Sequence, residues 1–169
     1  MKSIRSWLGI DSREAEFAPL RETLEALDHL EPARARYLAA FAYLLGRVAD
    51  ADQDVSPEEA ATMEALVRKH GQLPQDQAMV VVQLAKTSNL LFGGTANFLV
   101  AREFSELATY DQKLALMRCL FALAATDDTI STAEEGELHR IAAELRIDQP
   151  DLVKLRVSHR RHLPGVSRK

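Results

Sequence analysis

Apolar residues recur at steps of three and four along most of the chain, which is the spacing of one face of an α-helix. Four stretches carry the pattern most clearly. Their apolar positions are Tyr37, Phe41, Leu44, Leu45 and Val48; Met63, Leu66 and Val67; Leu114, Met117, Phe121 and Ala124; and Leu138, Ile141 and Leu145. The stretch 77–91 contains three consecutive valines, but its length favours a buried helix over a strand.

Helix start and stop signals divide the chain at consistent intervals. Starts are marked by Pro32, Ser56-Pro57, Thr109, Ser131 and Pro150, and ends by Gly71 and Gly93-Gly94. Capping-box spacing occurs at Ser56 with Glu59, Thr109 with Gln112, and Ser131 with Glu134. These signals predict an all-α fold, a compact bundle of seven or eight helices with no strand.

The chain contains an internal repeat. A shift of 75 positions lays residues 48–59 over residues 123–134. The matched pairs include Asp52 with Asp127, Val55 with Ile130, Ser56 with Ser131, and Glu59 with Glu134. Each unit reads as a long apolar helix, an acidic turn and a capped second helix. We call residues 50–56 the first acidic turn and residues 125–131 the second. The repeat predicts a pseudo-symmetric pair in which each unit covers the apolar face of the other.

Composition limits the class of protein. The 169 residues suit a single domain spanning 1–169, and 47% hydrophobic with 27% charged residues exclude a disordered chain. The single cysteine, Cys119, excludes a disulfide scaffold. No run approaches the ~18 apolar residues of a membrane span, and residues 1–12 form a short amphipathic segment rather than a secretory signal. We therefore expect a cytoplasmic protein.

The charges are unevenly distributed. Six basic residues and no acidic one occur from position 154 onward, which leaves a balance of −10 in residues 1–153. The six are Lys154, Arg156, Arg160, Arg161, Arg168 and Lys169. Residues 160–169 are interpreted either as a flexible, solvated tail or as a docking arm for an acidic lipid surface or partner. A nucleic-acid partner is disfavoured, because the acidic body would repel phosphate.

The motif Ala-Asp-x-x-hydrophobic-Ser-x-x-Glu after an apolar helix, used twice, resembles the TerB family of tellurite-resistance proteins. The same domain forms the N-terminal part of DjlA-type membrane co-chaperones. The resemblance covers about residues 38–153, although Gln53 and Asp128 stand where the family has glycine. It implies an all-helical fold and a non-enzymatic role in bacterial stress response. A complete co-chaperone is excluded, because the chain has no His-Pro-Asp signature.

The resemblance also implies a divalent-cation site, with Ca²⁺ favoured, in the acidic turns. Its ligands would be Asp52, Asp54, Glu59, Asp127, Asp128 and Glu134. Asp50, Asp52 and Asp54 copy the opening of an EF-hand loop, but Val55 and Ala61 occupy the positions of its glycine and bidentate glutamate, so an EF-hand is rejected. The alternative is structural: the serines and glutamates cap helices, and the aspartates lie near positive helix ends.

Two functional hypotheses follow. The first is a stress-response adaptor or sensor that binds a divalent cation in the acidic turns and a protein partner through an apolar surface. The second is a metal-free protein-interaction module related to the DjlA N-terminal domain. Peripheral contact with the inner membrane face would use the N-terminal segment or the basic tail, unless Trp7 and Leu8 fold back on the bundle. An enzyme is disfavoured, since Cys119 has no local catalytic partner.

Overall fold

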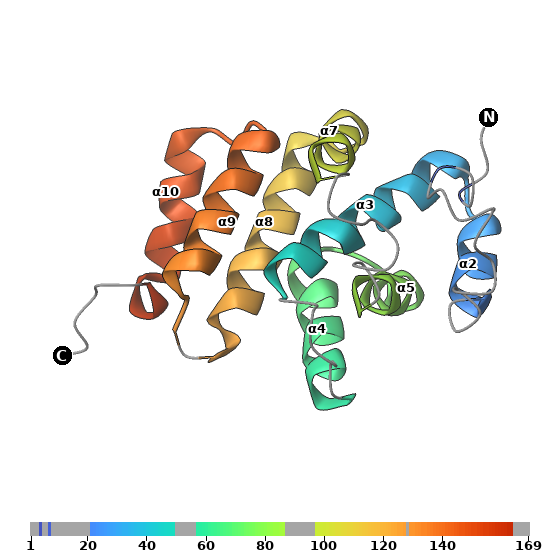
Figure 1. Cartoon of the computed structure of the whole chain (residues 1–169), viewed down its shortest axis with the longest axis horizontal. Coiled ribbons are helices and arrows are strands. Elements are labelled where there is room, and N and C mark those ends of the chain that lie inside the picture. The colour runs from blue at the N-terminus through green and yellow to red at the C-terminus, as the bar shows by residue number, and fades with distance from the viewer. Residues whose placement is uncertain are drawn as a thin grey trace.

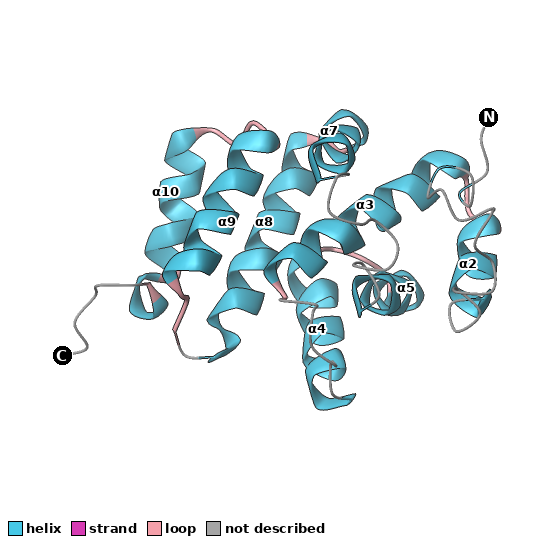
Figure 2. Cartoon of the chain, in the orientation of Figure 1, coloured by secondary structure: helices cyan, strands magenta, loops and turns pink. Residues whose placement is uncertain are grey.

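Every secondary-structure element in the described part of the chain is a helix (Figure 2). The computed structural model describes residues 4, 7, 21–49, 57–86, 97–127 and 129–163. The α-helices in these ranges are α2 (Arg21–Asp28), α3 (Pro32–Val48), α4 (Pro57–His70), α5 (Gln75–Lys86), α7 (Asn97–Leu107), α8 (Tyr110–Ala124), α9 (Thr132–Glu144) and α10 (Gln149–Ser158). Two 3₁₀ helices, η2 (Ala125–Asp127) and η3 (Arg160–His162), follow α8 and α10. The predicted all-α bundle is confirmed.

The helix starts agree with the sequence signals wherever the structure describes them. Helix α3 begins at Pro32, whose missing amide hydrogen costs nothing in a first turn. The Thr109 hydroxyl accepts from the Gln112 amide at 3.2 Å, and the Gln112 side chain accepts from the Thr109 amide at 2.9 Å. The box predicted for Ser56 and Glu59 rests on atoms outside the described part.

Helix α3 lies at the centre of the bundle and is buried around most of its circumference. It packs against α5, α7, α8 and α9 (Figure 1). Twelve of its 17 residues are buried. Ala39, Ala40 and Ala42 are fully buried, and side chains this small allow neighbouring helices to approach closely. These four helices are therefore positioned by their contacts with this one element.

An aromatic cluster joins α3 to α7. The rings of Tyr37 and Phe104 stack with centroids 5.2 Å apart, and Phe41 meets Phe104 edge-on at 6.2 Å. The two phenylalanines are completely buried. Pairs in these geometries contribute about 0.5–1.5 kcal/mol each beyond the burial of their surface. The cluster fixes the packing of α7 on α3.

Gly71 lets the end of α4 pack closely on Phe41 of the same cluster. Its amide donates to the carbonyl of Val67 at 2.9 Å, directly after the last residue of the helix. A Cβ atom at this position would lie 2.6 Å from that carbonyl oxygen and 2.9 Å from Cζ of Phe41. The predicted helix end is confirmed, and close packing rather than turn geometry explains why glycine occupies it.

Helices α8, α9 and α10 lie side by side at the end of the molecule opposite α2 (Figure 1). The Tyr110 hydroxyl donates to Asp151 at 2.6 Å, and the His159 ring stacks on Phe121. The Ile130 amide donates to the carbonyl of His162. The first residues of the segment expected to be a flexible tail thus form η3 and contact the second acidic turn.

The N-terminal segment contacts the bundle where the structure describes it. Ile4 is buried, and Trp7 is half-buried and packs against the core. This agrees with the interpretation in which the segment folds back. Leu8 lies outside the described residues.

The internal repeat is only partly reflected in the packing. Helices α4 and α9 begin at Pro57 and Thr132, which are 75 positions apart. Helix α4 packs extensively on α5, however, whereas the corresponding pair α9 and α10 share few close backbone contacts. The pseudo-symmetric pair therefore stays a prediction.

We expect Phe104→Ala to lower the free energy of unfolding by about 3–5 kcal/mol, because it removes a fully buried ring shared by two helices and leaves a cavity. Urea denaturation followed by circular dichroism measures the loss. Met79→Ala on the exposed face of α5 is the control and should change stability by less than about 0.5 kcal/mol. Similar losses in the two variants would contradict the central role of the cluster.

Candidate acidic-turn site

The six predicted cation ligands differ in how far the structure describes them. Asp52, Asp54 and Asp128 lie outside the described residues. Glu59 lies in α4 and Asp127 ends η2, but the described part includes only the backbone of each. Glu134 is described in full, so it is the one ligand whose side-chain contacts are known.

The described residues of the second acidic turn link α8 to α9 with local hydrogen bonds. The Thr126 hydroxyl donates to the carbonyl of Leu123 at 2.7 Å. The Ser131 hydroxyl accepts from the Glu134 amide at 3.1 Å, and the Glu134 carboxylate accepts from the Ser131 amide at 2.7 Å. Ile130 between them is buried. The predicted capping box is confirmed, and the buried isoleucine anchors the turn to the core.

The first acidic turn is bounded by the last residue of α3, Val48, and the first of α4, Pro57. Helix α3 ends at Val48 and α8 at Ala124, and both helices run toward the lower side of Figure 1. Arg47 in the last turn of α3 contacts Glu137, which lies one turn beyond Glu134. The last turn of α3 therefore lies directly against α9.

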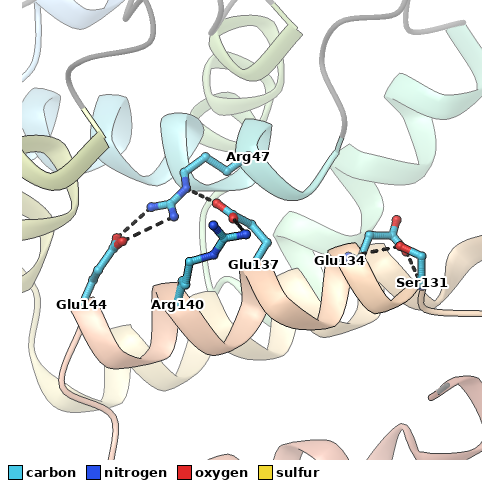
Figure 3. A network of polar contacts seen from close by, with 6 residues as sticks. All are labelled: Arg47, Ser131, Glu134, Glu137, Arg140 and Glu144. Atoms are coloured by element: carbon cyan, nitrogen blue, oxygen red, sulfur yellow. Dashed lines mark hydrogen bonds and ion pairs between the residues drawn. The ribbon is translucent and has the colours of Figure 1, made fainter. Parts of the chain in front are cut away.

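Arg47 is the centre of a polar network between these two helices (Figure 3). Its Nε donates to Glu137 at 2.5 Å, and one terminal nitrogen donates to Glu144 at 2.7 Å. Arg140 contacts the second oxygen of Glu137 at 2.9 Å. Our sequence analysis missed this network. The available signal was that Arg47 is the one charged residue among positions 37–48 of an otherwise apolar helix.

Burial makes this network electrostatically strong. The Arg47 side chain is only 10% exposed. Burial opposes its charge, but the hydrogen bonds to Glu144 and Glu137 outweigh that effect and raise the pKa of Arg47. One turn earlier, burial raises the pKa of Tyr43 to about 12. The guanidinium is therefore a permanent positive charge that neutralises the two glutamates.

This arrangement separates structural carboxylates from those available to a cation. Glu137 and Glu144 are committed to Arg47, and Glu134 holds the amide of its cap. No group of three or more His, Cys, Asp or Glu in the described ranges is placed to hold a metal ion. The implied donor set consists entirely of carboxylates, which are the hard oxygen ligands that Ca²⁺ prefers, and a carboxylate with one hydrogen bond keeps further acceptor capacity. The chemistry of the donors thus fits Ca²⁺.

Cys119 has the environment of a core residue. It is fully buried in α8. Burial raises the pKa of its thiol to about 12, so the thiolate that nucleophilic chemistry needs is absent near neutral pH. The prediction of a buried, inert cysteine is confirmed.

The described part of the chain defines a class of protein: an all-helical bundle in which α3 and α8 each precede an acidic turn in the sequence. A family model described as tellurite resistance protein TerB matches residues 37–157. The chain therefore belongs to the TerB family, as its sequence motif indicates. Comparison with curated proteins and with solved structures gives no significant match in either case.

In the ranges that the structure covers, no helix combines the length and apolar character needed to cross a bilayer.

We expect Arg47→Met to lower the free energy of unfolding by about 2–4 kcal/mol, because it leaves Glu137 and Glu144 half-buried without their partner. Urea denaturation measures the change. Arg102→Met is the matched control: its pair with Glu106 is well exposed, so the loss there should stay below about 0.5 kcal/mol.

Adding Glu137→Gln and Glu144→Gln to Arg47→Met should restore part of the lost stability, because the triple variant buries no unpaired charge. If Arg47→Met were as mild as the control, the network would not hold α3 to α9.

Proposed function

We propose that this protein is a non-enzymatic stress-response adaptor or sensor of the TerB family, and that one divalent cation, with Ca²⁺ favoured, is shared between its two acidic turns. The observation that carries the proposal is the pairing of Arg47 with Glu137 and Glu144, because it joins the last turn of α3, which precedes the first acidic turn, to α9, which follows the second. In this proposal the aspartates that follow α3 and α8 in the sequence share the ion. Cys119 supports a non-enzymatic role, because its buried thiol is protonated near neutral pH.

The distribution of charge supports a cation at this place. Asp50, Asp52 and Asp54 bring three carboxylates into the first turn, and Asp127 and Asp128 bring two into the second. Capping explains Ser131 and Glu134 but requires none of these aspartates. Like charges gathered on one side repel one another, and a bound cation removes that cost. When bound, the ion supplies charge neutralisation and ties the two turns together.

A second candidate is a metal-free protein-interaction module related to the DjlA N-terminal domain. The second turn supports this candidate, because hydrogen bonds and the buried Ile130 hold its described residues in place without an ion. The partner would then be a protein, and the aspartates would stabilise helix ends through the helix dipole.

Calcium titration by calorimetry, with melting temperatures measured in Ca²⁺ and in EDTA, separates the two candidates. Binding to the folded state at 100 times the Kd adds about 2.7 kcal/mol of stability, so the melting temperature should rise in Ca²⁺ and fall in EDTA. A shared site predicts that a double variant in either turn alone weakens Ca²⁺ binding at least about tenfold. The two double variants are Asp52→Asn with Asp54→Asn and Asp127→Asn with Asp128→Asn.

The matched control is Asp76→Asn with Asp111→Asn, which removes two aspartates from the first turns of α5 and α8. It should bind Ca²⁺ like the wild type. No heat of binding and no change of melting temperature in EDTA would reject the cation site and leave the metal-free module.

A further inference from the structure

Helix α10 exposes apolar side chains to solvent on one face. Three large hydrophobic side chains are exposed in the described part of the chain: Met79, Val153 and Val157. Two of them lie one turn apart on α10, where Val153 is 50% and Val157 57% exposed. Residues four apart share a helix face, so the valines form a short apolar stripe. Leu152 and Leu155 of the same helix are buried, so the stripe is not needed to attach α10 to the bundle.

Basic side chains surround this stripe. Lys154 is 79% exposed between the valines, and Arg160 and Arg161 are exposed in η3 directly after the helix. Asp151 contacts Lys154 at 3.8 Å, which is too loose to cancel the charge of this exposed side chain. Arg168 and Lys169 follow in the sequence with no acid between. We call Val153, Lys154, Val157, Arg160 and Arg161 the α10 face.

The α10 face is held rigidly by contacts on its other side. Tyr110 accepts from the amide of Asp148 at 3.0 Å and donates to Asp151. Arg156 pairs with Glu135 of α9 at 2.6 Å. These contacts use the residues that point inward and leave the α10 face outward, so a flat surface can meet it without rearrangement of the bundle.

The position of α10 also separates charge along the molecule. Helix α10 lies at one end of the longest axis and α2 at the other (Figure 1). Helix α2 exposes Glu22, Glu25 and Asp28. The exposed bases of the α10 face thus lie at the end of the molecule away from the exposed acids of α2.

We infer that the α10 face is a docking surface for an anionic phospholipid bilayer. A convex helix with exposed valines between lysine and arginine side chains matches a flat interface that offers phosphates and an apolar layer beneath them. A partner helix would instead need a groove to lie in. The N-terminal segment is the weaker alternative for membrane contact, because Ile4 is buried and Trp7 packs against the core. This inference does not depend on the cation site.

Co-sedimentation of the full chain with vesicles tests the inference. The vesicles contain phosphatidylcholine with about one third phosphatidylglycerol, or phosphatidylcholine alone, in EDTA and about 50 mM salt, which limits screening and removes any cation bridge. The protein should sediment with the anionic vesicles only, and high salt should release it. Lys154→Gln with Arg160→Gln and Arg161→Gln should weaken binding roughly tenfold or more, since each basic side chain near such a surface contributes about fivefold.

Two further variants locate the contact. Val153→Ser with Val157→Ser should weaken binding roughly threefold or more, because the stripe no longer enters the interface. Arg21→Gln with Arg102→Gln and Lys113→Gln removes as many charges elsewhere and should bind nearly as the wild type does. Circular dichroism confirms that each variant is folded.

Four results would overturn the inference. The first is no sedimentation of the wild type with anionic vesicles. The second is an equal loss in the matched charge control. The third is unchanged binding of the valine variant, which would leave adsorption by the tail charges alone. The fourth is a wild-type protein that self-associates and does not bind vesicles, with self-association lost in the Lys154→Gln, Arg160→Gln, Arg161→Gln variant. That result would assign the α10 face to a second copy of this chain.

Discussion

The burial of α3 is the constraint on which the rest of the structure depends. A helix that is apolar around most of its circumference cannot remain at a surface, so other helices must cover it from several directions. Helices α5, α7, α8 and α9 do so. The small side chains of Ala39, Ala40 and Ala42 set how closely they approach, and the rings of Phe41 and Phe104 fix one side. The ends of α3 and α8 that precede the two acidic turns take their positions from this packing.

The single strong polar interaction on α3 determines which carboxylates remain for function. Arg47 is at the carboxyl end of the helix, where it binds Glu137 and Glu144 of α9. With those two glutamates committed to Arg47, the carboxylates that remain for a cation are the aspartates of the turns with Glu59 and Glu134. The basic α10 face lies at the end of the molecule opposite the acidic α2. A cation site and the α10 face would be neighbours, because the carbonyl of His162 in η3 accepts from the amide of Ile130 in the second acidic turn.

The sequence predicts the fold well because the determining signals are local. The 3.6-residue period, Pro32 at the start of α3 and the capping boxes at Thr109 and Ser131 act within a few residues of chain. The Arg47 network escaped prediction because its partners lie 90 and 97 positions away, and no local pattern reports such a pairing. The packing role of Gly71 was not predictable for the same reason. A Cβ atom added at Gly71 would clash with the ring of Phe41, which belongs to another helix. Glu134 is correctly predicted as a cap.

The central claim is that the two acidic turns bind one cation together. Nuclear magnetic resonance of the ¹⁵N-labelled protein with substoichiometric Mn²⁺ tests it most directly, because this paramagnetic ion takes the same oxygen ligands and broadens the signals of nearby amides. The account predicts that signals from residues 50–56 and 125–131 broaden together at the lowest Mn²⁺ concentrations, while those of α2 and α10 remain sharp. Broadening confined to one turn, or weak and uniform over the chain, would contradict it.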